Sequence, residues 1–411
     1  MKPHITILHR VRGVDVSFAS HIDHSAYAVS YICTEHTRRY VPESAAMVVV
    51  LDDFTEAPVV AREFRDTFGT PERIVGLSEY DLLTAARLRE EFDVAGDRPD
   101  HVRRFRDKLP MGEAIAAAGI SVPAFAPAPD RYSVRKFAEL HGFPVIVKPR
   151  LGAGSVGVVK VDSEDGIAAL PDLTSEPYMV QQYCPDDIGF IDGVWDGSGL
   201  GPWRASYYVN NCLDFATAGG ALGTVEIDDP RLVPHFAEYT ESVCAALAGK
   251  TPTVFHLEYF LGYRGDGSPH IQFLEVAARI SGGETPNLWR DVHGYDLIGA
   301  ALDIQLGRTP HTGQLTDGLV IGDLIIRPPV TPPCTVISAH LELPDGVGPY
   351  WQQVPAAGSR IRETAGYQDI GASFRFRGSS SAEVRAAIEA TAAGFRMECV
   401  PDEVSETVSV A

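Results

Sequence analysis

The feature that most constrains this chain is a glycine-rich loop between two predicted strands. The segment 144–161 has the sequence PVIVKPRLGAGSVGVVKV, which places Gly152, Gly154 and Gly157 in a G-x-G-x-x-G pattern. That pattern indicates a dinucleotide site only where it opens a helix, and the valine-rich run after Gly157 favours a strand instead. Backbone N–H groups of a glycine loop between strands can close over phosphates, with Lys148 entering from the first strand. The segment therefore predicts a flap over a nucleotide, and a protein that handles ATP.

Size and charge narrow the class of protein. The chain has 411 residues, more than the roughly 250–300 at which one hydrophobic core stops growing, so we expect two or three lobes. A formal net charge of -20 argues against nucleic acid or an anionic membrane as a partner. The six cysteines are scattered, with no C-x-x-C motif, which is typical of a reducing compartment. With no signal peptide or long apolar run in the sequence, we expect a soluble, cytoplasmic protein.

The first hundred residues alternate short apolar runs with helical stretches, a pattern that predicts a small parallel α/β layer. We expect strands at residues 5–8, 47–51 and 73–77, and helices at 58–67 and 78–92. In the second helix, Ser78 is the expected N-cap and Asp81 its capping partner. Residues 96–100 are the expected hinge to the next lobe.

From Val145 the pattern becomes rich in predicted strands. The expected strands are 145–147, 156–161, 178–182, 203–209, 254–261 and 271–276. The expected helices on either side of this change are 111–118, 133–141, 232–247, 295–306 and 382–393.

Two glutamates form a second informative pair. The strands that carry Glu258 and Glu275 flank a turn containing Asp266 and Gly267, and Asp-Gly is a strong hairpin signal. A turn centred between these two residues places Glu258 directly opposite Glu275. Opposed like charges destabilise a sheet, so the pair needs compensation, which Mg²⁺ would supply. In the alternative interpretation, the register slips and one glutamate lies at a solvated edge.

Several candidate residues can be interpreted either functionally or structurally. Arg279 shares the strand alternation of Glu275, which would let it hold a transferring phosphoryl group. Lys148 follows three apolar residues in a strand too apolar for a solvated face, which favours a functional role. Lys108 ends a basic run of the kind that normally forms a solvated helix face. His256 shares the alternation of Glu258 and fits a core histidine equally well.

Four features follow one another along the chain: the strand lysine, the glycine flap, the carboxylate pair and the arginine after it. In this order of features, the chain resembles the ATP-grasp superfamily. It is most similar to the carboxylate–amine ligases that include bacterial L-amino-acid ligases, over roughly residues 75–330. The resemblance implies that Arg279 and Lys148 are catalytic and that Glu258 and Glu275 bind the metal. It also implies a nucleotide site, in which the hinge backbone contacts the base, formed by Lys108, Lys148, Gly152, Gly154, Ser155, Gly157, Gln181, Gln182, Tyr183 and Asp187.

The resemblance further implies an α/β fold with α+β lobes. An N-terminal α/β pre-ATP-grasp domain would span 1–105, a central lobe with the glycine flap 106–183, a C-terminal lobe with the metal and phosphate site 184–400, and a frayed tail 401–411. The implied cofactors are ATP and Mg²⁺, with Mn²⁺ as an alternative ion. The implied reaction joins a small carboxylic acid to an amine through an acyl phosphate, forming an amide between amino-acid-like substrates and releasing ADP and phosphate. The implied assembly is a homodimer.

The chain departs from the family pattern in places. Gln181 and Ile188 occupy positions where relatives often have glutamates, the later of which contacts ribose, and Asp187 is the expected substitute. Ala277 replaces the asparagine of Glu-x-Asn-x-Arg, which removes one ligand of a two-magnesium site. The pocket shape would decide the substrates, and the candidates for this role are Trp203, Asn287, Trp289 and Arg290.

Three other functions compete with the ligase hypothesis. An ATP- and bicarbonate-dependent carboxylase would use the same scaffold, and a degenerate copy would bind nucleotide without turnover. An NAD-dependent oxidoreductase is what the glycine pattern alone suggests, and the strand after Gly157 argues against it.

The flap and residues 210–220 are the expected lids over the site.

Overall fold

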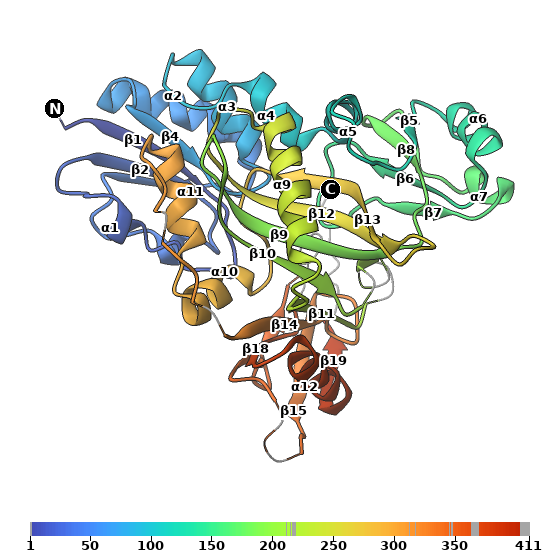
Figure 1. Ribbon diagram of the computed structural model, residues 1–411. Helices are drawn as coiled ribbons and strands as arrows, with labels where there is room; N and C mark the ends of the chain where they lie inside the picture. The colour runs from blue at the N-terminus through green and yellow to red at the C-terminus, as the bar shows by residue number, and fades with distance from the viewer. Residues whose placement is uncertain are drawn as a thin grey trace, which may run out of the picture.

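The computed structural model describes residues 2–402 except 211, 214, 216–218, 312, 317, 345, 347 and 363–369. Most of the predicted frayed tail and part of the predicted lid at 210–220 therefore lie outside the described residues. The described residues form four sheets (Figure 1), and their mixed α/β content confirms the predicted fold class. None of the described helices is long and apolar enough to cross a membrane.

The N-terminal sheet is parallel, as the α/β pattern predicts. Its strand order is β3-β2-β1-β4. The strands are β1 (His4–His9), β2 (Ala28–Cys33), β3 (Met47–Val50) and β4 (Arg73–Gly76), and the helices around them are α1 (Phe18–His21), η1 (Arg38–Tyr40), η2 (Phe54–Glu56), α2 (Ala57–Phe68) and α3 (Leu82–Glu91). The sequence patterns did not predict β2, although it lies inside the sheet.

Two predictions in this layer are wrong. Helix α3 begins at Leu82 rather than near Ser78, and the side chain of Asp81 makes no capping hydrogen bond. Asp81 instead accepts a hydrogen bond of 2.7 Å from Nε of Arg10, which comes from a segment distant in the sequence. Helix α4 (Pro99–Arg106) begins within the expected hinge at 96–100, with proline in its first turn, and residues 96–98 form the connection before it.

Helix α5 (Lys108–Ala117) follows α4 directly and leads to the central sheet. The Asp107 side chain caps α5 by accepting a hydrogen bond from the Leu109 N–H, so Lys108 is the first helical residue. The central sheet has the order β5-β8-β6-β7 and lies at the right of Figure 1. Its elements are β5 (Phe125–Pro127), α6 (Arg131–His141), β6 (Val145–Pro149), β7 (Val159–Val161), α7 (Glu164–Ala168) and β8 (Tyr178–Gln182).

The largest sheet has eight strands in the order β13-β12-β9-β10-β11-β14-β18-β16, all paired antiparallel. Its strands are β9 (Asp187–Trp195), β10 (Leu200–Tyr208), β11 (Ala221–Glu226), β12 (Thr253–Tyr263), β13 (Pro269–Ala277), β14 (Val320–Ile326), β16 (Trp351–Gln353) and β18 (Ala372–Gly378). Helix α9 (Val233–Leu247) packs on it through Phe236, Val243 and Leu247.

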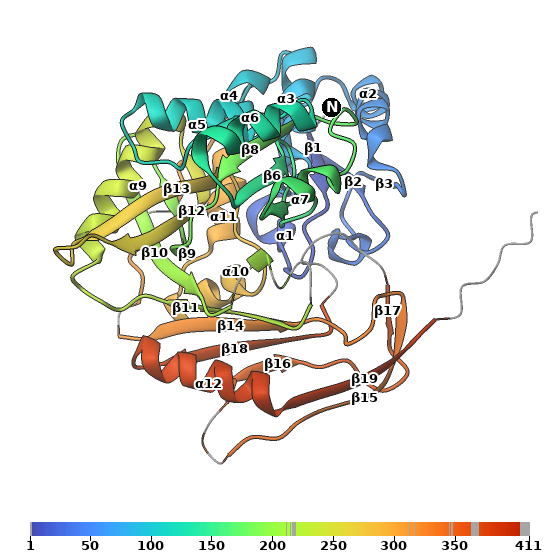
Figure 2. The same ribbon diagram turned by 90° about the vertical axis from the view of Figure 1, so that its right-hand side faces the viewer.

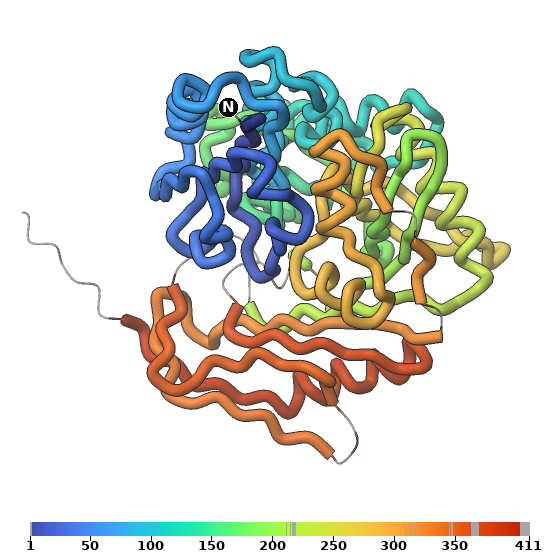
Figure 3. Tube along the Cα trace, turned by 90° about the vertical axis from the view of Figure 1, so that its left-hand side faces the viewer, coloured from blue at the N-terminus to red at the C-terminus, as the bar shows by residue number. Residues whose placement is uncertain are grey.

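Besides β16 and β18, the last part of the chain supplies a helix and a small sheet that lie next to β14 and β18 (Figures 2 and 3). Helix α12 (Ser381–Gly394) packs against β14 and β18 through Val384 and Ile388. A three-stranded sheet of order β17-β15-β19 lies beside it. Its strands are β15 (Cys334–Leu341), β17 (Arg360–Ile361) and β19 (Phe395–Pro401).

The predicted pairing of Glu258 with Glu275 is confirmed, but by a different hairpin from the symmetric one. Near the turn, Tyr263 pairs with Pro269, which centres the turn on Asp266. Continuing that register would place Glu258 opposite Leu274. A β-bulge between Glu258 and Tyr259 shifts the pairing by one residue and brings Glu275 opposite Glu258.

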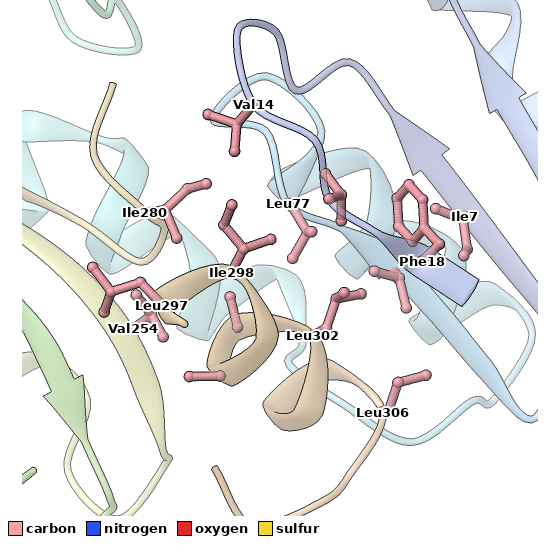
Figure 4. Packing of buried hydrophobic residues seen from close by; sticks show 14 of the residues in the cluster. Ile7, Val14, Phe18, Leu77, Val254, Ile280, Leu297, Ile298, Leu302 and Leu306 are labelled. Carbon is pink, nitrogen blue, oxygen red and sulfur yellow. The ribbon is translucent and has the colours of Figure 1, made fainter. Parts of the chain in front are cut away.

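A shared hydrophobic core joins the N-terminal sheet to the largest sheet (Figure 4). Helix α11 (Leu297–Gln305) supplies Ile298 and Leu302, which pack among Ile7 and Leu77 on one side and Val254 on the other. The short helix α10 (Thr285–Leu288) and the π-helix η3 (Trp289–His293) precede α11. This packing fixes β4 and the loop after it next to the largest sheet, where the candidate site lies.

Candidate nucleotide and phosphoryl-transfer site

A single cavity of about 410 Å³ lies where the central sheet, the glycine flap and the largest sheet meet. The predicted residues in its wall are Lys108, Lys148, Gly152, Gly154, Ser155, Gln181, Gln182, Tyr183, Asp187, Glu258, Glu275 and Arg279. Gly157 is not among the lining residues. The fold therefore brings together residues that are far apart in the sequence, and their functional roles remain predictions.

The two lysines approach the carboxylate pair from different elements. Nζ of Lys108, at the start of α5, lies 3.0 Å from Oε2 of Glu275. Lys148, on β6, is only 4% exposed, and its Nζ donates a hydrogen bond of 2.8 Å to Oε1 of Gln181. Burial lowers the pKa of Lys148 to about 8, although Glu275 opposes that shift. A phosphate group entering the cavity would therefore meet two ammonium groups.

The beginning of the flap is attached to the α4–α5 junction. Lys108 Nζ donates to the carbonyl of Gly152 at 2.6 Å, and Nη2 of Arg106 donates to the carbonyl of Leu151 at 2.9 Å. Arg150 forms a bidentate ion pair with Asp107, at 2.8 and 2.6 Å. These contacts fix one end of the flap.

Beyond these contacts, the flap backbone takes conformations that favour glycine. Gly154 and Gly157 have φ angles of 61° and 73°, in the left-handed region. A Cβ on Gly157 would also lie 2.8 Å from Cγ of Pro149. Gly157 is therefore needed for the shape of the loop, whereas Gly154 lines the cavity directly.

The opposed carboxylates are compensated in part by the lysines. Burial would raise the pKa of Glu275, but the charges of Lys108 and Lys148 outweigh it and lower the pKa to about 2. Oε1 of Glu258 accepts a hydrogen bond of 2.9 Å from the Tyr208 hydroxyl. From the sequence, we expected a divalent cation alone to compensate the two negative charges. The lysine and tyrosine partners of the glutamates were not predicted.

Arg279 is held by a residue that the sequence argument missed. Glu79, which is 9% exposed and follows β4, accepts a hydrogen bond of 2.8 Å from Nε of Arg279 and also forms an ion pair with Arg106. Burial would raise the pKa of Glu79, but the two guanidinium groups outweigh it and hold the pKa below its ordinary value. Glu79 and Arg279 are 200 positions apart, so no local pattern could have revealed the contact.

His256 lines the cavity and is not a histidine of the hydrophobic core, which was the alternative interpretation. Its Nδ1 lies 2.8 Å from Oδ1 of Asp192, and its Nε2 lies 3.7 Å from Oε1 of Glu258. Burial would lower the pKa of His256, but Asp192 outweighs that effect and raises it to about 9. A protonated His256 places a third positive charge beside the carboxylate pair.

The nucleotide end of the cavity has an apolar wall next to the hinge, formed in part by Ile146, Ile188, Phe260 and Leu274. Such a wall suits a flat base. The N–H groups of Gln182 and Tyr183 already donate to the carbonyls of Ala124 and Pro144, at 2.8 and 3.4 Å. These two N–H groups are therefore already hydrogen-bonded within the protein, and the predicted contact with the base would be made by carbonyl groups of the hinge.

The four candidates for substrate selection do not line the cavity. Trp203 packs in the core beneath α9, and Trp289 is buried in the core around α11. Asn287 donates a hydrogen bond of 2.8 Å to Glu284, and Arg290 pairs with Asp296 at 3.0 Å. Their predicted role in substrate selection therefore has no support in this geometry.

The carboxylate pair has the donor chemistry that Mg²⁺ prefers. Glu258 and Glu275 lie opposite each other and both line the cavity. Among the described residues, no group of three or more His, Cys, Asp and Glu side chains is arranged to hold a metal ion. The residues therefore fit a cation that takes two carboxylates from the protein and its other oxygens from water and phosphates.

The fold and the cavity together define the class of structure: the chain has the ATP-grasp fold. No family model matches the sequence. The sequence is 26% identical over 278 residues to an L-arginine-specific L-amino acid ligase of Bacillus subtilis, covering 64% of this chain and 65% of that protein. The chain thus spans slightly less than two thirds of the length of this relative.

Solved structures show the same fold. The fold is similar to that of an L-amino acid ligase from Bacillus licheniformis, with a TM-score of 0.73 and 17% identity, covering 97% of this chain and 98% of that chain. It is also similar to the biotin carboxylase domain of the Hydrogenobacter thermophilus 2-oxoglutarate carboxylase, with a TM-score of 0.68 and 15% identity, covering 97% and 91%. These similarities confirm the predicted ATP-grasp fold and the resemblance to carboxylate–amine ligases.

Proposed function

We propose that this protein is an ATP-dependent carboxylate–amine ligase that joins amino-acid-like substrates and releases ADP and phosphate. The observation that carries the proposal is the single cavity lined by the flap, both lysines, the carboxylate pair and Arg279. The sequence similarity to an L-arginine-specific L-amino acid ligase supports the same reaction class.

The first chemical step is transfer of the γ-phosphoryl group of ATP to the carboxylate of the acid. The bond from the γ-phosphorus to the bridging oxygen breaks, ADP leaves, and an acyl phosphate forms. Lys108 and Lys148 neutralise charge on the phosphates, and the flap covers them. Mg²⁺ bound by Glu258 and Glu275 would neutralise the remaining phosphate charge.

The second step is attack of the amine on the acyl carbon. The amide bond forms, the carbon–oxygen bond to phosphate breaks, and inorganic phosphate leaves. Arg279 carries a positive charge in the wall of the same cavity and stabilises the negative charge that develops on the acyl oxygen and the departing phosphate. Because water would hydrolyse the acyl phosphate, the flap has to exclude water during this step.

The proposal is tested by phosphate release from MgATP against a matrix of carboxylic acids and amines, with mass spectrometry of the products. We expect ADP as the nucleotide product and an amide from at least one pair. Hydroxylamine should trap the acyl phosphate as a hydroxamate. AMP as the nucleotide product would refute phosphoryl transfer to the acid.

The same assay separates the competing functions. The structural similarity to a biotin carboxylase domain makes bicarbonate a necessary arm of the matrix. ATP turnover that depends on bicarbonate and on no other acid would identify a carboxylase. ATP binding without turnover on any mixture would identify a non-catalytic scaffold.

The remaining expectations concern ions and assembly. Mn²⁺ should replace Mg²⁺, since both are hard cations that accept carboxylate oxygens. A homodimer predicts about twice the mass of one chain in light scattering. Both measurements use the purified full chain.

A further inference from the structure

At the end of the cavity away from the hinge lies a carboxylate that the sequence argument did not identify. Asp323, on β14, lines the cavity and is 4% exposed. Its Oδ1 accepts a hydrogen bond from the Thr224 hydroxyl, and its Oδ2 accepts one of 3.2 Å from the Glu284 N–H. Both partners are neutral donors, and no Lys, Arg or His of the described residues forms an ion pair with Asp323.

The other acidic groups around this end of the cavity have cationic partners. Glu284 pairs with Arg375 at 2.8 Å, and Asp192 pairs with His256 at 2.8 Å. Asp323 therefore stands out as a buried carboxylate without a compensating charge. Burial, together with the charges of Glu284 and Asp192, raises the pKa of Asp323 to about 6.

A second polar group at the same end has no partner. Ser281 is 6% exposed, lines the cavity, and its Oγ makes no hydrogen bond in the structure. Its loop lies against Asp323, because a Cβ on Gly283 would be 2.9 Å from Oδ2 of Asp323. A buried hydroxyl without a partner costs free energy, and a bound group that donates hydrogen bonds would satisfy it.

This end of the cavity is continuous with the phosphoryl-transfer end. Asp192 acts on Asp323 electrostatically and bonds to His256, whose other nitrogen faces Glu258. A small molecule with an anionic and a cationic end could therefore reach both groups of residues at once. An ammonium group matches the missing charge at Asp323 and has three donors for the carboxylate and the hydroxyl.

We propose that Asp323, assisted by Ser281, binds the ammonium group of the acyl-donor substrate and so restricts that substrate to amino acids. The assignment rests on the proposed ligase function and adds the residue that selects its acid substrate. The ammonium group concerned is the one that does not react. An amine that is to attack must lose its proton, whereas a carboxylate partner favours the protonated form.

The experiment compares amino acids with the matching acids that lack the amino group, such as alanine with propionate and phenylalanine with 3-phenylpropionate. The purified full chain is assayed with MgATP and hydroxylamine, so that the hydroxamate reports acyl transfer without a second substrate. We expect kcat/KM for the amino acid to exceed that for its matched acid by on the order of 100-fold, because an unpartnered buried charge disfavours the acid without nitrogen.

Two variants test the residues themselves. Asp323→Asn should reduce that preference at least about 10-fold, chiefly by lowering kcat/KM for the amino acid. Ser281→Ala should reduce it a few-fold, and it removes a hydroxyl without a partner, so folding should be preserved. Asp229→Asn is the matched control, since Asp229 is paired with Arg231 outside the cavity wall.

Each outcome has a distinct meaning. Equal activity of the wild-type protein on both acids of every pair would overturn the role of Asp323 and leave the ligase function standing. Retention of the full preference by folded Asp323→Asn, with ADP affinity as the check on folding, would overturn it as well. Absence of hydroxamate from every acid would overturn the ligase function, and this inference with it.

Discussion

Glu275 and Asp323 are carboxylates at two ends of one cavity, and their surroundings are opposite in charge. Glu275 lies beside two lysines, which outweigh the effect of burial and lower its pKa to about 2. Asp323 has two neutral donors and acidic neighbours, and burial raises its pKa to about 6. The first end carries cations for a polyanion, whereas at the second end no cation of the described residues pairs with Asp323.

This contrast shows how one cavity can orient a substrate. A nucleotide triphosphate is attracted to the end with Lys108 and Lys148, in a chain whose net charge is otherwise -20. An ammonium group is attracted to the other end. In the proposed reaction, an amino acid would bind with its carboxylate toward the phosphates, the orientation that phosphoryl transfer requires.

The strongest test of the contrast is Glu275→Gln. Loss of this charge should lower turnover on the order of 100-fold or more for every acid, with or without an amino group, because it weakens the phosphate and metal site itself. The measurement is ADP release under saturating MgATP. Asp323→Asn, by comparison, should discriminate between the two kinds of acid.

The same Glu275→Gln variant has a stability consequence. An argument from opposed glutamates alone expects the metal-free protein to be no less stable. Because Lys108 pairs with Glu275 at 3.0 Å, we now expect the melting temperature to fall by a few degrees, since two lysines lose their partner. Normal activity together with a lowered melting temperature would contradict the metal assignment.

A second prediction concerns Glu79, which connects the loop after β4 to Arg279. Glu79→Gln should destabilise the protein by about 3 kcal/mol, because two buried guanidinium groups lose their ion-pair partner. The folded-state pKa of Glu79 is lowered, so its contribution is present above the ordinary carboxyl pKa of about 4.3 and is lost as the pH falls through the folded pKa.

Urea unfolding at a series of pH values measures that contribution. The difference between wild type and Glu79→Gln should be largest near neutral pH and should shrink below about pH 4. Glu91→Gln is the control, because Glu91 pairs with Arg62 at the surface and surface pairs contribute little. A constant difference at all pH values would refute the electrostatic explanation.

The flap should affect only the nucleotide end. Gly154→Val introduces a β-branched residue at a φ angle of 61°, which should raise the KM for ATP about 10-fold and leave the KM for the acid nearly unchanged. Gly157→Val should act in the same direction through loop shape. Gly265→Ala is the control, since a Cβ there meets nothing within 4 Å. Unchanged ATP kinetics in both valine variants would place the nucleotide elsewhere.

The smallest expected effect is the pH dependence of nucleotide affinity. The pKa of Lys148 is lowered to about 8 by burial, so the lysine is charged below pH 8 and loses its proton above it. Affinity for ADP should therefore fall a few-fold as the pH rises from 7 to 9, with proton uptake on binding near pH 8. Calorimetry in two buffers measures the uptake, and Lys148→Met should abolish it.

Much of the nucleotide end could be predicted from the sequence, because its signals are local. The glycine pattern, the strand after it and the preceding lysine lie within 18 residues of chain. Turn chemistry and side-chain alternation act over the same short range. For that reason, the flap and the strands around it appear in the structure close to where the pattern places them.

The end of the cavity around Asp323 could be identified only from the tertiary structure. Asp323 gives no local signal, and its properties arise from Thr224, Glu284 and Asp192, which come from three other parts of the chain. The pairing of Glu258 with Glu275 is an intermediate case. The hairpin signal predicted the correct pair, but a bulge that no pattern announced sets the register.

The sequence by itself determined the class of fold, the glycine-rich loop and many of the residues that line the cavity, since these follow from the preferences of neighbouring residues. Only the tertiary structure decided which charges are compensated. Electrostatic energy in a buried site depends on distances between groups that are remote in sequence and on how far each is withdrawn from water. That is why Glu79 and Asp323 could be identified only after the chain was folded.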